Sequence, residues 1–189
     1  MCALFEYVSA PHRSRYIAST HAAGVLAGND QYCSSGKLNQ GFDCDGFYAE
    51  YVIVSPKNTV QIPDNLPLEK LSPLFCAGIT AFSAVKKLDS PARGLVGVFG
   101  LGGVGTFVVR FAIAMGFQVI GYDVSEAARK TAIARGALEA IDSSHIEHVK
   151  TETRRITGGR GLDGAIVAAG VAPAYAAAVE AIGFSKQVS

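Results

Sequence analysis

The feature that most constrains the fold is a glycine-rich turn between an apolar run and a helical pattern. Residues 100–105 are Gly100, Leu101, Gly102, Gly103, Val104 and Gly105, a G-x-G-x-x-G motif. The apolar run at 95–99 predicts a strand before it, and residues 104–115 have helical periodicity after it. In that context the glycines permit a tight turn, a close backbone approach to a pyrophosphate, and close packing of helix on strand. The motif predicts a dinucleotide-binding turn; the alternative is a structural turn with no ligand.

Strand and helix patterns continue to alternate through the rest of the chain. We expect strands at 95–99, 117–122, 140–142 and 165–169, and helices at 104–115, 125–135, 145–156 and 172–182. This alternation implies a parallel sheet with right-handed crossovers. A complete dinucleotide-binding domain has six strands in the order 3-2-1-4-5-6. Residues 91–189 therefore predict an α/β fold with an incomplete Rossmann-type sheet of about four strands, whose fourth strand is an exposed apolar edge.

An acidic residue follows the glycine turn at the spacing of a cofactor site. Asp123 lies 18 residues after Gly105, at the end of the second expected strand. A carboxylate there can accept hydrogen bonds from both adenosine ribose hydroxyls, and it repels a 2′-phosphate. This favours NAD over NADP, although Arg129 on the next expected helix tempers the preference. The candidate cofactor-binding set is the six residues of the turn together with Asp123, Arg129 and Ala169, which ends the fourth expected strand.

The first half of the chain has a weaker pattern. Residues 1–40 predict loops with a short helix at 14–23, followed by strands at 46–54 and 59–62. Residues 67–88 predict one helix, because apolar residues recur there at three- and four-residue spacing. The change of pattern near Pro91 predicts two domains, 1–90 and 91–189.

Charge and composition exclude several classes of protein. The 17 Lys and Arg residues against 16 Asp and Glu residues, without basic runs, give no electrostatic signature for nucleic acid. The longest uncharged stretches, 94–109 and 164–179, are shorter than the ~20 residues that span a bilayer. Four cysteines do not predict a disulfide framework in a chain of 189 residues. We therefore expect a cytoplasmic protein without membrane or nucleic-acid partners.

Together, the motifs resemble the zinc-type alcohol dehydrogenases of the medium-chain dehydrogenase/reductase family, from about residue 28 to residue 182. Residues 45–51 resemble the family's D-G-x-x-A-E-Y strand, 74–82 the helix that carries a catalytic-zinc ligand, 100–105 with Asp123 the cofactor fingerprint, and 157–163 its T-x-G-x-G-x-D segment. The resemblance implies that residues 1–90 are a remnant of a GroES-like β domain with a connecting helix. It also implies a chain truncated at both ends relative to the family.

The resemblance assigns two candidate catalytic residues, but most of the family's zinc ligands have no counterpart in this chain. It implies that Cys76 occupies a zinc-ligand position and that Thr80, one helical turn later, faces the nicotinamide. The family's upstream cysteine and G-H-E histidine have no counterpart here. Cys33 resembles the end of the structural-zinc motif, but the three earlier cysteines of that motif are replaced by Ser19, Ala22 and Val25. We therefore expect no bound zinc and no metal site.

Three functions are compatible with this pattern. The first is an alcohol dehydrogenase-like oxidoreductase that binds NAD(H), transfers hydride to or from a small molecule without zinc, and can have reduced redox activity. The second is a non-redox cyclase, isomerase or dehydratase on the same scaffold. The third is a non-catalytic nucleotide-binding pseudoenzyme. The cofactor motif favours the first. The exposed edge of the fourth expected strand predicts a homo-oligomer, such as a dimer.

Overall fold

The computed structural model describes residues 2–9, 12–19, 42, 44–48, 51, 59–67, 70–88, 90–91 and 93–188. For residues 2–9, 12–19, Thr59 and 184–188 it describes the backbone alone. The chain divides into two compact units, Met1–Cys76 and Ala77–Ser189, which are described separately below. The domain boundary predicted near Pro91 stays a prediction.

The first unit contains a small antiparallel sheet. Strand β1 (Cys2–Ser9) pairs with β2 (His12–Ser19), and β2 pairs with β3 (Thr59–Gln61). The strand predicted at 59–62 is confirmed as β3. The loops and helix predicted for the first residues are wrong over 2–9 and 12–19, because hairpin pairing supplies backbone hydrogen bonds that a search for sustained periodicity does not detect. Most of the strand predicted at 46–54 lies outside the described residues.

The single helix predicted at 67–88 is two helices. A 3₁₀ helix, η4 (Ser72–Phe75), is followed by α1 (Ala77–Lys86), and Cys76 lies between them with φ −124° and ψ −75°. The physical reason is Pro73, which has no N–H and is tolerated only in the first turn of a helix. A continuous helix from 67 to 88 would place this proline in its interior.

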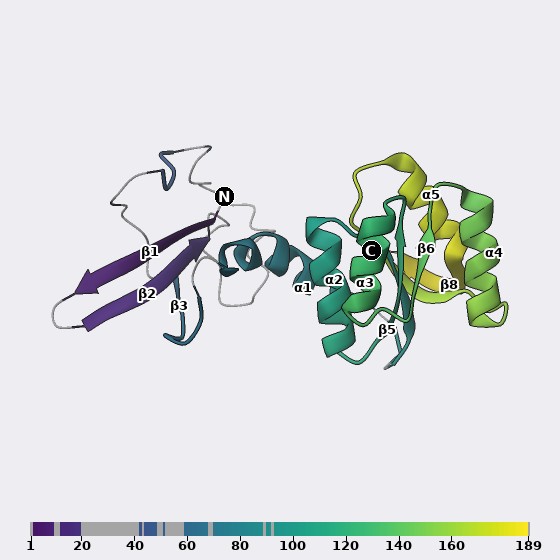
Figure 1. Cartoon of the computed structure of the whole chain (residues 1–189), viewed down its shortest axis with the longest axis horizontal. Helices are drawn as coiled ribbons and strands as arrows, with labels where there is room; N and C mark the ends of the chain where they lie inside the picture. Colours follow the sequence, from purple (N-terminus) through teal and green to yellow (C-terminus); the bar gives the residue numbers. More distant parts are fainter. Residues whose placement is uncertain are drawn as a thin grey trace. The chain divides into compact units, whose positions relative to one another are not determined.

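The second unit is a parallel sheet with the strand order β6-β5-β4-β7-β8. Figure 1 shows this unit in teal to yellow, with β5, β6 and β8 labelled. Its strands are β4 (Leu95–Phe99), β5 (Gln118–Asp123), β6 (Glu139–Asp142), β7 (Leu162–Val167) and β8 (Ile182–Val188). Every pair of neighbouring strands is parallel. The order of the first four strands confirms the predicted Rossmann-type fold.

Two predictions about the sheet, its number of strands and its exposed edge, are wrong because β8 is present. The sheet has five strands instead of about four, and β7 pairs with β8, so β7 is not an exposed edge. The predicted helix at 172–182 ends at Ala181, and Ile182 begins the strand. The alternation of Ile182, Phe184 and Val188 with smaller or polar residues is a period-two signal too short to identify alone. The prediction of a homo-oligomer depended on an exposed fourth strand, and this argument for it no longer applies.

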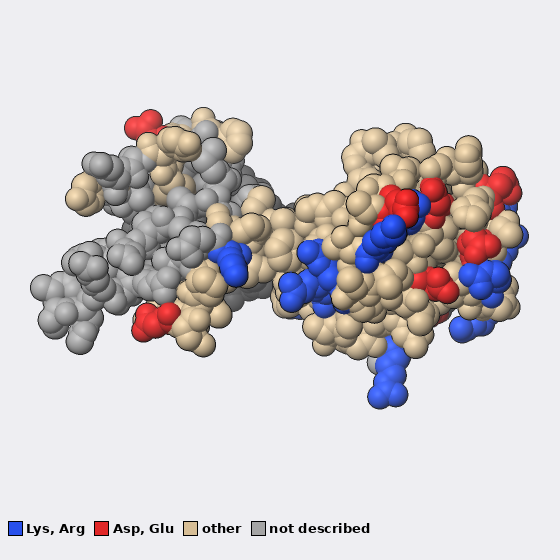
Figure 2. All heavy atoms as spheres, viewed as in Figure 1, with Lys and Arg blue, Asp and Glu red and all other residues tan. Residues whose placement is uncertain are grey.

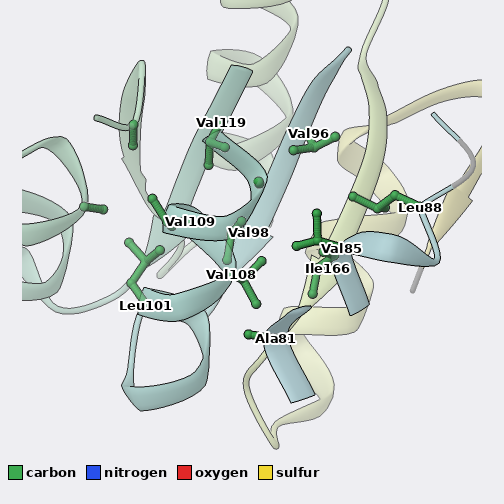
Figure 3. Close-up of a cluster of buried hydrophobic side chains, with 13 residues drawn as sticks. Ala81, Val85, Leu88, Val96, Val98, Leu101, Val108, Val109, Val119 and Ile166 are labelled. Atoms are coloured by element: carbon green, nitrogen blue, oxygen red, sulfur yellow. The ribbon is translucent and has the colours of Figure 1, made fainter. Parts of the chain in front are cut away.

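Five helices cover the two faces of this sheet. Helices α1, α2 (Gly103–Ala114) and α3 (Glu126–Ala134) contribute to one core cluster, and α4 (Ile146–Thr157) and α5 (Ala172–Ala181) contribute to the other. Figure 3 shows the first cluster, where α1 and α2 meet strand side chains of β4, β5 and β7. The apolar residues whose spacing predicted this helix are not all buried. Val85 is buried, but Ile79 and Phe82 are exposed, and the small residues Gly78 and Ala81 are buried instead.

Strand β4 lies at the centre of the sheet and faces both clusters. Val96 and Val98 belong to the first cluster, whereas Leu95 and Phe99 belong to the second, as the alternation of a strand requires. The ring of Phe99 stacks on Tyr122 with 4.1 Å between centroids. The buried Tyr122 hydroxyl lies 2.7 Å from that of Thr153, and burial raises the pKa of the phenol well above its ordinary value. This buried central strand ends at the glycine turn.

The surface of the described residues carries both signs of charge. In Figure 2 the basic and acidic side chains of the second unit are interspersed on the face that is shown. Surface ion pairs include Glu126 with Lys130 and Glu180 with Lys150. Within the described residues, no helix combines the length and the apolar character needed to cross a bilayer.

Candidate nucleotide-binding site

The glycine turn rests on a closely packed floor made by Gly100, Gly105 and Ala169. Gly100 has φ +91°, a conformation that side chains disfavour, and its N–H donates to the Tyr122 carbonyl oxygen at 2.8 Å. A Cβ on Gly100 would lie 2.8 Å from the Ala169 Cβ. A Cβ on Gly105 would collide with the Gly100 carbonyl oxygen. These two glycines are therefore required by the packing of the turn itself.

The other two glycines form an open rim. Gly102 and Gly103 have negative φ or helical backbone, and a Cβ on either would meet no described atom within 4 Å. Nothing in the described structure therefore demands glycine at these positions. A flat backbone with open space before it is what a pyrophosphate needs in order to approach closely.

Helix α2 starts at this rim. Its N-cap is Gly102, which has no side chain to cap the first N–H groups. The first turn of this helix contains no acidic residue. The first N–H groups of a helix have no intrahelical partner, and they carry a partial positive charge. The helix start is held in place by Thr106, whose hydroxyl donates to the Leu101 carbonyl oxygen at 3.2 Å. Together these features form an anion-binding helix end.

Asp123 connects the turn to the end of β5. One oxygen of its carboxylate accepts the Leu101 N–H at 2.6 Å, and the other accepts the Ser125 N–H at 2.8 Å. The Leu101 side chain is buried against Gly121. A carboxylate offers about four lone pairs, so these two bonds leave acceptor capacity for a ligand. The carboxylate is thus fixed next to the rim by the fold.

Arg129 lies across the ends of two strands. Its Nη1 donates to the Asp123 carbonyl oxygen at 2.7 Å, and its Nη2 lies 3.2 Å from Oδ2 of Asp142, the last residue of β6. Asp123 and Asp142 are paired positions of the parallel β5–β6 ladder. The hydroxyl and backbone N–H of Ser144, followed by the charge of Arg129, hold the pKa of the Asp142 carboxyl below its usual range.

The structure gathers all of the predicted cofactor residues at one edge of the sheet. Gly100 to Gly105, Asp123, Arg129 and Ala169 all follow or adjoin the carboxyl ends of β4, β5 and β7. Cys76 is exposed and directly precedes α1, and Thr80 is exposed on that helix. Their predicted catalytic roles stay predictions.

Metal ligands show no grouping in the described part of the chain. Among those residues, no group of three or more His, Cys, Asp or Glu side chains could hold a metal ion. Cys2 and Cys33, together with much of the region predicted to carry the degraded zinc motif, are not described at the side-chain level. The expected absence of zinc therefore stays a prediction.

Sequence reasoning missed three participants at this edge. They are the Tyr122 carbonyl, the Ser125 N–H and the carboxylate of Asp142. The first two are backbone groups and leave no signal in the sequence. Asp142 had a signal, since it ends an expected strand of a parallel sheet, and the carboxyl ends of parallel strands meet at the same edge.

Comparisons with known proteins agree with this geometry. A family model described as zinc-binding dehydrogenase matches residues 103–187. An alcohol dehydrogenase of Geobacillus stearothermophilus is 35% identical over 130 residues, which are 69% of this chain and 38% of that protein. The chain thus spans about two fifths of this curated relative.

Solved structures show the same fold. The alcohol dehydrogenase of the archaeon Aeropyrum pernix has a TM-score of 0.80 at 27% identity, covering 93% of this chain and 53% of that one. A solved NAD-dependent alcohol dehydrogenase has a TM-score of 0.79 at 25% identity, over 93% of this chain and 52% of that one. The glycine turn, the parallel sheet and these similarities together show that the chain belongs to the medium-chain dehydrogenase/reductase family, among its zinc-type alcohol dehydrogenase-like members.

Proposed function

We propose that the chain binds NAD(H) at the edge described above, as part of an alcohol dehydrogenase-like oxidoreductase that acts on a small-molecule substrate. The observation that carries the proposal is the open rim of Gly102 and Gly103 beside the fixed carboxylate of Asp123. The family membership supports the class of reaction, and the rim and carboxylate support the cofactor.

The glycines of the rim support a ligand, because the packing of the fold does not require glycine at these two positions. Gly100 and Gly105 are explained by backbone conformation and packing, whereas Gly102 and Gly103 have neither reason. Glycine is an accepted N-cap residue, so Gly102 also suits the helix start, whereas Gly103 lies inside the helix, where glycine is less stable than alanine, and has no internal cause. A pyrophosphate that contacts the backbone N–H groups supplies that function.

The acidic residue supports NAD in preference to NADP. The free lone pairs of the Asp123 carboxylate suit the two hydroxyls of an adenosine ribose, and its negative charge opposes a 2′-phosphate. Arg129, the neighbouring cation, is engaged by the Asp123 carbonyl and by Asp142. A solved neighbour of this chain is a NAD-dependent alcohol dehydrogenase, which agrees with this preference.

The redox part of the proposal extends beyond the nucleotide edge. The nicotinamide ring of a bound cofactor supplies the hydride acceptor or donor. Thr80 is the candidate residue to face that ring, and Cys76 is the candidate at the family's zinc-ligand position. In the part of the chain that the structure describes, no group of three or more His, Cys, Asp or Glu side chains could hold a metal ion, and the Cys76 thiol by itself cannot form a tetrahedral zinc site. We therefore propose hydride transfer without zinc, with reduced redox activity as one form of it.

The test is calorimetric titration of the purified chain with NADH, NADPH and ADP-ribose. We expect NADH and ADP-ribose to bind, and NADPH to bind about tenfold more weakly than NADH, which equals about 1.4 kcal/mol of discrimination. Failure of all three to bind would contradict the proposal. Metal analysis of the same preparation should give well under one zinc per chain, and a stoichiometric zinc that chelators remove would contradict the zinc-free form.

Hydride transfer is distinguished from binding by comparing two of these ligands. NADH should bind more tightly than ADP-ribose if the chain also contacts the nicotinamide. Equal affinities, together with no change in nicotinamide absorbance in the presence of candidate alcohols and aldehydes, would restrict the function to nucleotide binding.

A further inference from the structure

The candidate cofactor-binding set contains one cation, Arg129, and the structure shows its guanidinium held by other groups of the protein. The Arg129 side chain is only 17% exposed, and its guanidinium is held at two points, by the Asp123 carbonyl oxygen at 2.7 Å and by Asp142 at 3.2 Å. Asp123 supplies both that carbonyl and the carboxylate that we propose binds the ribose. The guanidinium therefore contacts the same residue that the ribose would contact. A guanidinium at such a place is the usual partner of a 2′-phosphate.

The two contacts on Arg129 differ in kind. The Asp123 carbonyl is a neutral acceptor in the strand end, whereas Asp142 provides the opposite charge. Asp142 is itself fixed, since its other oxygen accepts two hydrogen bonds from Ser144, at 2.9 Å from the backbone N–H and 2.5 Å from the hydroxyl. A carboxylate held in this way keeps its partner cation in a single direction, toward the end of β6.

We infer that Asp142 is a specificity-determining residue of the nucleotide site, because it holds Arg129 away from the position that an adenosine 2′-phosphate would occupy. The inference rests on the proposed binding of NAD(H). Two acidic residues then disfavour NADPH. Asp123 repels the 2′-phosphate, and Asp142 holds Arg129 so that its positive charge cannot offset this repulsion.

The first test is Asp142→Asn, with calorimetric titration of NADH and NADPH. The change keeps the shape and an acceptor oxygen for Ser144 but removes the charge that holds Arg129. We expect NADPH to bind about tenfold more tightly than it binds the unchanged chain, as one charge-assisted pair forms with the phosphate. The affinity for NADH should change by less than about twofold, since the Asp123 carboxylate is untouched.

Two further variants separate release of Arg129 from loss of a negative charge. Glu126→Gln removes one negative charge from the first turn of the same helix, where Glu126 pairs with the exposed Lys130, and it should leave the NADPH-to-NADH ratio unchanged. Asp142→Asn introduced into an Arg129→Met chain should also leave the ratio unchanged, because the cation is gone. An equal effect of Glu126→Gln, or an effect that persists without Arg129, would overturn the inference.

Arg129→Met by itself provides an independent measurement if the asparagine variant does not fold. A cation that Asp142 withholds contributes nothing to NADPH binding, so we expect the affinity for NADPH to stay within about twofold. A tenfold loss would show that Arg129 already binds the phosphate, and the inference would be wrong. Absence of ADP-ribose binding in the unchanged chain would defeat the proposed function, whereas intact binding with an unmoved ratio would defeat this inference alone.

Discussion

The floor and the rim of the glycine turn contain the same residue type for different reasons. In the floor, Gly100 has a positive φ and lies against Ala169, and a Cβ on Gly105 would collide with the Gly100 carbonyl oxygen. In the rim, Gly102 and Gly103 are open to solvent, and a Cβ would fit. The fold therefore accounts for the glycines of the floor, whereas for the glycines of the rim we propose a ligand. Substitutions should therefore affect stability in the floor and affinity in the rim.

The largest expected effect is that of Gly105→Ala in the floor. The added methyl group would collide with the Gly100 carbonyl oxygen, so the turn or helix α2 must shift. We expect the free energy of unfolding to fall by about 3 kcal/mol or more, with loss of nucleotide binding. Urea denaturation followed by circular dichroism measures this change. A loss below about 0.5 kcal/mol would show that the floor is not a packing constraint.

An intermediate effect is expected for Asp123→Asn, which lies between the two regions. The variant keeps one acceptor oxygen for the Leu101 or Ser125 N–H but loses the charge and one acceptor. We expect NADH to bind roughly 10- to 100-fold more weakly, since hydrogen bonds to charged groups contribute about 1.5–3 kcal/mol. NADPH should lose less, so the ratio of the two affinities should approach one. Parallel titrations measure that ratio, and an unchanged ratio would remove Asp123 from the specificity argument.

The smallest expected effect is that of Gly102→Ala in the rim, which is also the matched control for Gly105→Ala. Its methyl group meets no described atom within 4 Å, so the free energy of unfolding should change by less than about 0.5 kcal/mol. Binding of NADH should weaken by roughly fivefold, about 1 kcal/mol, because the methyl group obstructs the pyrophosphate. Denaturation and calorimetry on one preparation report both quantities. Unchanged NADH affinity would mean that the rim does not face the cofactor.

Much of the second unit could be predicted from local sequence. Three signals act within a few residues: the apolar run at 95–99, the positive-φ glycines Gly116 and Gly136 that follow α2 and α3, and Ser125, which caps the start of α3. The structure has the strand and the two helices that the sequence predicts at these places. The antiparallel strands β1 and β2 and the edge strand β8 were missed, because their formation depends on pairing with other segments. Short strands have weak local signals, and long-range pairing decides them.

The sequence by itself determined the glycine turn, the alternation of four strands with helices and the position of Asp123 at a strand end. Each follows from a residue's own backbone preferences or from the periodicity of its neighbours. Only the tertiary structure decided that Gly102 and Gly103 stay open while Gly100 and Gly105 are closed in. It also decided that Arg129 is held by Asp142. The contact of Gly100 with Ala169 and the ion pair of Arg129 with Asp142 join residues far apart in the sequence, which parallel pairing brings to one edge of the sheet.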